Sequence, residues 1–191
     1  AFLNDKIDLT QAEAIADLDP LLVLGGGDYA YFNTDKRYGT LDASIDAWLE
    51  QSQPFLSTSV FMPTYGNHEI LLGEGYDDWA DRFATPDGWN DRRAYSFDVG
   101  DVHFISILAQ HEIGRLPDAE AEWIEADIAA AQAAGRRWII PYLHGAPFSE
   151  GESHPSNLPL RTQLGRLFGR YDIHLVLYSH DQSFERTYPL E

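Results

Sequence analysis

The chain of 191 residues contains no cysteine and only two lysines, Lys6 and Lys36. Without cysteine it can form no disulfide, carries no thiolate nucleophile and has no zinc site of the cysteine type. It also lacks any apolar run close to the roughly 18–20 residues that a helix needs to cross a bilayer. These absences exclude a disulfide scaffold, cysteine-dependent catalysis and a membrane-spanning helix.

The charge of the chain is strongly one-sided. Aspartate and glutamate number 31 against 13 lysines and arginines, which gives a formal net charge of -18. Such a chain repels nucleic acid and anionic membranes, so neither is an expected partner. Solubility in a salty environment would explain the acidity by itself. Bound cations can nevertheless reverse the local field and let an acidic protein act on phosphate anions.

Hydrophobic residues make up 44% of the chain and aromatic residues 13%, enough for the core of one domain spanning residues 1–191. Hydrophobic periodicity and capping residues predict helices at 10–18, 40–52, 76–84, 116–135 and 158–171. Strands are predicted at 21–25, 59–64, 138–143 and 173–178, and as a pair around Gly100 and Asp101 within 94–108. This alternation predicts an α/β sheet with helices on its faces.

Side chains that can bind metal follow four of the predicted strands. Ligands of open α/β sheets bind outside the carboxyl ends of the strands, so these four loops are expected to meet at one rim. Imidazole suits Zn, Fe, Mn or Ni, oxygen donors suit Mn or Fe(III), and a phenolate suits a ferric ion. In chain order the candidates are Asp28 and Tyr31, then Asn67 and His68, then His144, and finally His180.

Each of these residues alone has an ordinary explanation, as a turn residue or a hydrogen-bonded loop histidine, and only the ordered set points to a metal site. His103 and His174 lie in predicted strands and are interpreted as structural. His111 and His154 lie in predicted loops, where a substrate-facing role stays open.

The ordered set resembles a known family. GD-x-x-Y from Gly27, GNHE from Gly66, the strand-end His144 and SHDQ-x-FER from Ser179 are similar to motifs of the calcineurin-like metallophosphoesterases, most closely the purple acid phosphatase-like branch. The segments AYSFDVGDVHFISI and EWIEADIAAA also resemble that branch. The likeness runs from about residue 10 to residue 188.

The resemblance implies a β-sandwich flanked by helices, with a dinuclear centre of Fe, Mn or Zn at the strand ends. It also implies a secreted or periplasmic location and a phosphate-ester small molecule as the substrate. By matching position, Asp28 would bridge the two metals and Tyr31 would bind the first. Asn67, His144 and His180 would complete the second site. His68 would stabilise the phosphoryl oxygens or protonate the leaving group.

Two departures from the family pattern fall on the first metal. The D-x-[GH] motif would fall at or before residue 1, so the fold is expected to lack the first strand, and also the C-terminal strands. Gln182 stands where the family usually has its last histidine, and its carbonyl oxygen is a weaker ligand than imidazole. We therefore expect a second metal site that binds well and a first site that is weak or empty.

The favoured function is hydrolysis of phosphate mono- or diesters by a metal-activated hydroxide. The alternative is a non-catalytic relative that binds phosphate or a partner on the same scaffold with a degraded metal centre, which the two departures motivate. A hydrolase of another ester class with a single metal is a third reading.

Overall fold

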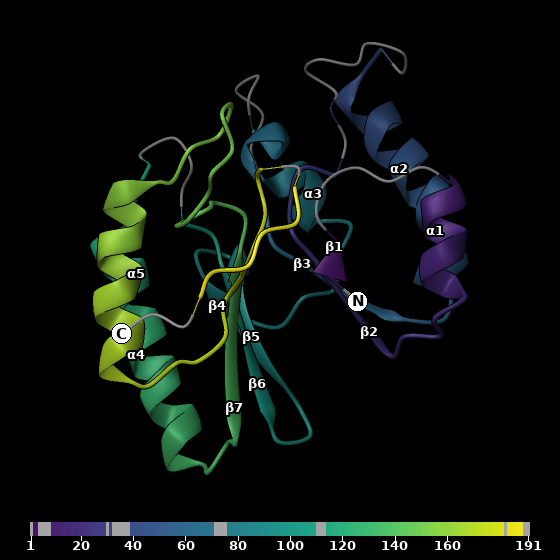
Figure 1. The fold of residues 1–191 in the computed structure, drawn as a ribbon. Coiled ribbons are helices and arrows are strands. Elements are labelled where there is room, and N and C mark those ends of the chain that lie inside the picture. The colour runs from purple at the N-terminus through teal and green to yellow at the C-terminus, as the bar shows by residue number, and fades with distance from the viewer. Residues whose placement is uncertain are drawn as a thin grey trace.

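The computed structural model describes residues 2–3, 9–29, 31, 39–70, 76–109, 114–181 and 183–188. Within these residues two sheets lie face to face with helices on both outer sides (Figure 1). The fold is therefore α/β, with a mixed β-sandwich between helical layers. None of the described helices is long and apolar enough to span a membrane.

The first sheet has three parallel strands in the order β1-β2-β3. Their bounds are Phe2–Leu3 for β1, Leu22–Gly25 for β2 and Val60–Pro63 for β3. From the sequence, no strand is expected at the position of β1. A pair of residues is too short to show a hydrophobic period, so only the pairing of Phe2 with Leu24 reveals this strand.

The second sheet has five strands in the order β4-β5-β6-β7-β8, antiparallel from β4 to β6 and parallel from β6 to β8. Their bounds are Gly88–Trp89, Ala94–Val99, Val102–Ile107, Trp138–Leu143 and Leu177–Tyr178. The predicted hairpin around Gly100 is confirmed by β5 and β6. The last strand is shorter than predicted, because the Ile173 amide donates to the Phe168 carbonyl at the end of the preceding helix.

Helices α1 (Leu9–Ala16) and α2 (Leu41–Leu56) cover the outer face of the first sheet, and α4 (Asp118–Ala133) and α5 (Leu158–Arg170) cover the second (Figure 1). The short α3 spans Asp77–Ala80. Thr40 caps α2, with its side chain accepting from the Ala43 amide at 3.2 Å. This helix extends beyond the predicted residue 52, through Pro54, because Phe55 in its last turn is buried against Ala12 and Val23.

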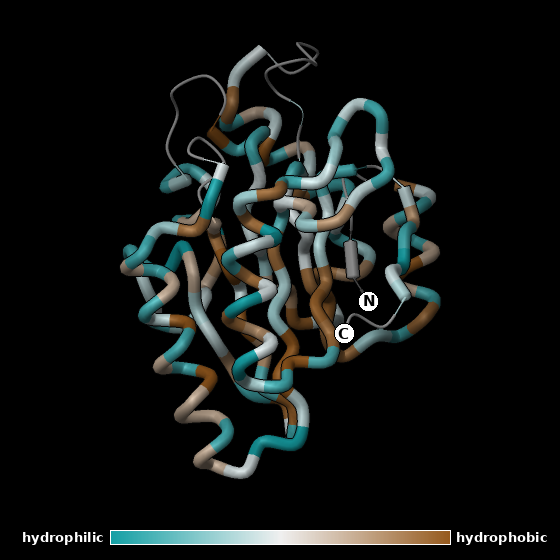
Figure 2. Tube along the Cα trace, turned by 60° about the vertical axis from the view of Figure 1, so that its left-hand side comes forward, coloured by the Kyte–Doolittle hydropathy of each residue, from teal (hydrophilic) through white to brown (hydrophobic). Residues whose placement is uncertain are grey.

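The molecule has four layers, two of helices and two of sheet, and a hydrophobic core fills each of the three spaces between them. Ile124 and Ile128 of α4 join a core with β6, β7 and α5, while Ile45 and Trp48 of α2 join an aromatic core beside the first sheet. The core between the two sheets consists of Leu24, Met62, Tyr95 and Tyr142. Figure 2 shows that the hydrophobic segments concentrate in the central strands, as burial of apolar area requires.

Hydrogen bonds at the end of β3 align the two sheets. The Pro63 carbonyl accepts from the Tyr95 hydroxyl at 2.6 Å and from the Ser106 hydroxyl at 3.2 Å. The Thr64 hydroxyl donates to the Ile107 carbonyl at 3.0 Å. All of these groups are buried, where leaving one unpaired would cost about 1–3 kcal/mol. The pairing fixes the end of β3 beside the end of β6, and so brings the loops of both sheets to one rim.

Candidate metal centre

Loops that follow β2, β3, β7 and β8 meet at this rim. The sequence predicts six ligand candidates in these loops, and three of them offer atoms that lie within 4.8 Å of one another: Asp28, His144 and His180. Another candidate, Asn67, begins the 3-10 turn Asn67–Glu69 and is buried beside His144. The structure therefore gathers side chains from four loops that are far apart in sequence.

The contacts converge on one atom, Nε2 of His144. It lies 3.0 Å from Nδ1 of His180, 3.1 Å from Oδ1 of Asn67 and 3.2 Å from Oδ2 of Asp28. All three neighbours are groups that bind metals through a lone pair. His144 itself is only 2% exposed, so water does not separate these atoms.

The other nitrogen of His144 fixes the tautomer. Its Nδ1 lies 2.8 Å from the Gly26 carbonyl oxygen, which can only accept, so Nδ1 carries a proton and donates. In the neutral imidazole, Nε2 then presents a bare lone pair toward three other electron-rich atoms. One added proton would serve only one of these contacts well, whereas a metal ion would serve all of them. A backbone carbonyl on the far nitrogen is also the usual way in which proteins orient a metal-binding histidine.

The charges around this atom favour a cation. Burial alone would raise the pKa of Asp28, but the attraction and hydrogen bond of His144 outweigh it and the pKa is lowered. Burial alone would likewise lower the pKa of His144, but Asp28 outweighs it and the pKa is raised. Both shifts record the attraction between the Asp28 carboxylate and a cationic His144, and a metal ion held by these side chains would supply the same positive charge in place of the proton.

Glu69 holds two of the ligand loops in place. Its carboxylate accepts from the Asp28 and Tyr29 amides at 2.9 Å and from the Gly66 amide at 2.6 Å. The His68 amide in turn donates to Oδ1 of Asp28 at 2.9 Å. Burial, together with Asp28, raises the pKa of Glu69 to about 7. The GNHE motif alone assigns no role to Glu69, because the partners of this side chain are backbone amides that no sequence pattern specifies.

Two glycines let the loops approach this closely. A Cβ on Gly27, which has a φ of 89°, would lie 2.7 Å from both the Gly66 nitrogen and Nδ1 of His144. A Cβ on Gly66 would lie 2.3 Å from Oδ1 of Asp28. Real contacts of this kind are not found below 3.0 Å. Both glycines are thus required by the close approach of the two loops, and Gly27 is required by its left-handed backbone as well.

Two of the ligand candidates have a strained backbone. Asp28 has a φ of 57° and His180 a φ of 76°, both in the left-handed region that residues with a side chain seldom occupy. Such conformations cost on the order of 1–3 kcal/mol and concentrate at functional sites. Here they turn a carboxylate and an imidazole back toward His144.

The remaining predicted site residues lie around this cluster. The ring of Tyr31 stacks on that of His68, with centroids 4.0 Å apart and planes at 36°. Tyr31 therefore lies beside the predicted catalytic histidine, and its role as a ligand of the first metal stays a prediction. Gln182 lies outside the described residues.

The other histidines fall into different places. His154 packs against His180, with ring centroids 4.1 Å apart, so the loop after β7 reaches the ligand cluster. His103 is buried and lies 2.8 Å from the carboxylates of both Asp98 and Asp127, away from the cluster. His174 is exposed, and His111 lies outside the described residues.

The donor set fits a transition metal. Two imidazoles, a carboxylate and an amide oxygen suit Zn, Mn or Fe better than the all-oxygen shells that Ca and Mg prefer. Among the described residues, this is the group of histidine and carboxylate side chains whose atoms converge closely enough for one ion. The arrangement accounts for one ion.

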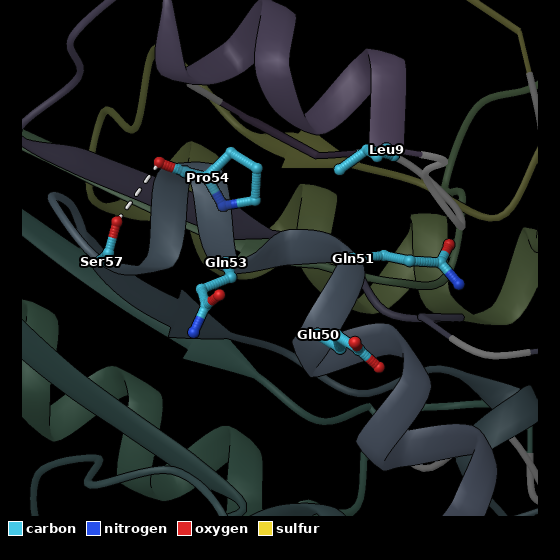
Figure 3. Close-up of a pocket in the computed structure, with 6 residues that line it drawn as sticks. All are labelled: Leu9, Glu50, Gln51, Gln53, Pro54 and Ser57. Atoms are coloured by element: carbon cyan, nitrogen blue, oxygen red, sulfur yellow. Dashed lines mark hydrogen bonds between the residues drawn. The ribbon is translucent and has the colours of Figure 1, made fainter.

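A shallow groove lies elsewhere, between α1 and α2 (Figure 3). The residues that line it are Leu9, Glu50, Gln51, Gln53, Pro54 and Ser57. None of them is a ligand candidate, and Glu50 is the one titratable group in that lining. The ligand candidates therefore lie at the strand ends and not in the lining of this groove.

The chain is similar to acid phosphatases over most of its length. Purple acid phosphatase 23 of Arabidopsis thaliana is 26% identical over 202 residues, 93% of the chain and 44% of the relative. Acid phosphatase type 7 of Homo sapiens is 29% identical over 187 residues, 88% of the chain and 41% of the relative. The protein of that name in Danio rerio is 26% identical over 206 residues, 95% of the chain and 44% of the relative.

No protein-family model matches the chain. The chain spans less than half the length of each of these relatives.

Proposed function

The chain is a distant homologue of the purple acid phosphatase-like branch of the calcineurin-like metallophosphoesterases, and from this premise we propose that it hydrolyses phosphate mono- or diesters with the help of bound metal. The observation that carries the proposal is the convergence of Asp28, Asn67 and His180 on Nε2 of His144. The comparisons support the class of reaction, because all three of these relatives are acid phosphatases by name.

In this proposal Asp28, Asn67, His144 and His180 hold the metal, and Tyr31 binds a second ion if one is present. Bound metal supplies Lewis-acid polarisation of the phosphoryl oxygens and lowers the pKa of a coordinated water. The Gly26 carbonyl keeps Nε2 of His144 unprotonated and aimed at the ion. Glu69 keeps the loops of Asp28 and Asn67 at a fixed separation through their backbone amides.

His68 is the proposed acid. Its amide donates to Asp28, which places the residue directly beside the ligand cluster, while its side chain is only half-buried. The Tyr31 ring restricts how the imidazole can turn. From this position His68 would donate a proton to the oxygen of the leaving alcohol, a contribution that is typically about 100- to 10,000-fold in rate.

The test is hydrolysis of p-nitrophenyl phosphate by the chain after loading with Zn, Mn or Fe. We expect turnover that a chelator removes and added metal restores. His144→Ala should lower kcat/KM at least about 100-fold, because changes to residues that merely orient a ligand already cost 10- to 100-fold. His174→Ala, the same change at an exposed histidine, is the matched control and should leave turnover unchanged.

The outcomes separate the candidate functions. Turnover that survives in His144→Ala would contradict the metal-dependent mechanism. Metal binding without turnover on any phosphate ester would favour the non-catalytic relative that binds phosphate or a partner.

A further inference from the structure

The loop of residues 148–157, called the rim loop below, follows β7 and His144 and reaches back to the segment after β8. Hydrogen bonds anchor one of its ends and a cation–π contact the other. The Asn157 amide donates to the Ala146 carbonyl at 2.9 Å, and the Asn157 side chain caps α5 by accepting from the Leu160 amide at 3.0 Å. At the other end, the guanidinium of Arg161 lies 4.1 Å from the centre of the Phe148 ring. The middle of the loop is held by contacts with residues beyond β8.

Two carboxylates beyond β8 hold that middle part. Oδ2 of Asp181 accepts from the Ser149 hydroxyl at 3.3 Å, and also from the Ser183 hydroxyl at 2.9 Å. The Glu150 amide donates to the Glu185 carboxylate at 3.2 Å. Asp181 directly follows His180, so the residue that holds the rim loop is the chain neighbour of a metal-ligand candidate.

Gly151 is the point of closest approach. A Cβ built on it would lie 2.3 Å from Cγ, Oδ1 and Oδ2 of Asp181 alike, so the carboxylate covers the glycine Cα. Gly151 is not among the residues with a positive φ, and another residue could therefore adopt its backbone conformation. Glycine is needed at this position for the contact with Asp181 and not for the turn.

The contact of Gly151 with Asp181 determines where the rim loop lies relative to the ligand cluster. The ring of His154, in the second half of the rim loop, lies 4.1 Å from that of His180, whose ring lies 4.8 Å from that of His144. Moving the middle of the loop away from Asp181 would carry His154 off His180. The Gly151–Asp181 contact thus fixes the position of a loop wall beside the site where an ester would bind.

We infer that Gly151 and Asp181 are positioning residues that set the distance of the rim loop from the ligand cluster and thereby the affinity for the ester. This inference rests on the proposed function. Neither residue touches the reacting atoms; both act through the rim loop and His154. Their contact controls substrate binding more than the chemical step, because the metal ligands themselves do not belong to the loop.

The test is the variant Gly151→Ala, alone and combined with Asp181→Ala. The added methyl group must displace either the loop or the Asp181 carboxylate, which would then leave Ser149 and Ser183. We expect KM for p-nitrophenyl phosphate to rise about tenfold, with kcat changed less than about threefold and metal content unchanged. In the double variant the methyl group occupies the space of the lost carboxylate, so KM should fall below that of Gly151→Ala, while the lost hydrogen bond from Ser149 keeps it above the wild-type value.

Amide hydrogen exchange supplies a readout of the contact itself. The Ser149, Glu150 and Gly151 amides all donate to side-chain oxygens, so their exchange is slowed in the wild type. Exchange at these amides should accelerate in Gly151→Ala and slow again in the double variant. Gly165→Ala is the matched control, because a Cβ at Gly165 on α5 meets nothing within 4 Å and should change neither readout.

The failures are distinguishable. A metal-loaded wild type without turnover overturns the proposed function, and with it the role of the contact toward a substrate. Wild-type turnover with an unchanged KM in Gly151→Ala, or a double variant no better than Gly151→Ala, overturns the inference alone.

Discussion

At the scale of single residues, Glu120 shows how a buried carboxylate can be held without any cation. It lies in the first turn of α4, fully buried, and accepts from the Leu108 amide at 2.7 Å and the Ala109 amide at 3.2 Å. Burial raises its pKa from 4.5 to about 7, and the two amide hydrogen bonds only partly oppose this. Glu120 therefore fixes the backbone just beyond β6, which lies beside β7 and His144.

The raised pKa predicts a pH-dependent stability. The folded chain holds the proton of Glu120 more tightly than the unfolded chain, so its contribution is fully present below about pH 4.5 and is lost as the pH rises through about 7. Since a tenfold change in proton affinity corresponds to about 1.4 kcal/mol, the loss is roughly 3 kcal/mol. Glu120→Gln should abolish this part of the pH dependence of the free energy of unfolding.

Urea unfolding between pH 5 and pH 8 measures this contribution of Glu120 to the pH dependence of stability. The free energy of unfolding of the wild type should fall relative to that of Glu120→Gln over this range. Glu122→Gln, at an exposed position of the same helix, should follow the wild type. Parallel curves for wild type and Glu120→Gln would show that Glu120 does not titrate in this range.

Residue types at strand ends were enough to predict which side chains lie near His144, because each predicted ligand follows an apolar run. Glu69 and Glu120 could not be assigned a role in the same way. Their partners are backbone amides brought close by the fold, and a sequence pattern specifies a side chain but not the amides it meets. The contact of Gly151 with Asp181 was hidden for the same reason.

At the scale of elements, His103 joins the β5–β6 hairpin to α4. Its two ring nitrogens lie 2.8 Å from Asp98 of β5 and from Asp127 of α4. A neutral imidazole donates only one hydrogen bond, so the charged form suits this position better. Burial opposes the charge, but hydrogen bonds with Asp127 and Asp98 outweigh it and raise the pKa of His103.

This arrangement predicts that the contribution of His103 to stability, like that of Glu120, falls as the pH rises. A raised histidine pKa gives stability that is fully present below about pH 6.5 and is lost as the pH rises through the folded-state pKa. His103→Gln should therefore destabilise the chain by roughly 1–3 kcal/mol at pH 6, as expected for hydrogen bonds to a charged group, and by less at pH 9. Thermal or urea unfolding at the two pH values measures the difference.

The matched control is His174→Gln, at an exposed histidine. This change should leave the free energy of unfolding unaltered at both pH values. An equal cost of His103→Gln at pH 6 and pH 9 would mean that the charge of His103 contributes nothing to the attachment of α4.

Elements with a clear hydrophobic period were predicted closely. Element ends that depend on contacts elsewhere in the fold were not. The 16-residue α4 and the six-residue β7 have strong patterns of buried residues, and both lie within a few residues of their predicted bounds. The strand β8 and the end of α2 depend on contacts made elsewhere in the fold. Residue 173 has strand-like neighbours but its amide ends α5, and Phe55 continues α2 past a proline that favours ending it.

At the scale of the whole molecule, two sheets deliver their loops to one rim. The first sheet supplies Asp28 and Asn67, and the second supplies His144 and His180. Neither sheet alone holds the full set, so the site depends on the core between the sheets and on the hydrogen bonds to Pro63. The α/β class was predicted from the sequence, but this division of the ligands between two sheets requires the pairing of strands.

The formal net charge of -18 bears on the same site. A phosphate ester approaching an acidic surface is repelled over distances of about 10 Å at moderate ionic strength. Metal held by Asp28 and the two histidines would reverse the sign of the field at the rim, which is what hydrolysis of an anion requires. Metal binding is thus the central claim on which both the site and the proposed function depend.

The most direct test of that claim is the metal content of the chain, purified without chelator and measured by elemental analysis. We predict at least one Zn, Mn or Fe per chain in the wild type and in His174→Ala, and almost none in His144→Ala. A content near two would mean that the site beside Tyr31 is also filled. A folded wild type that holds no metal, even after each of these ions is added back, would contradict the account.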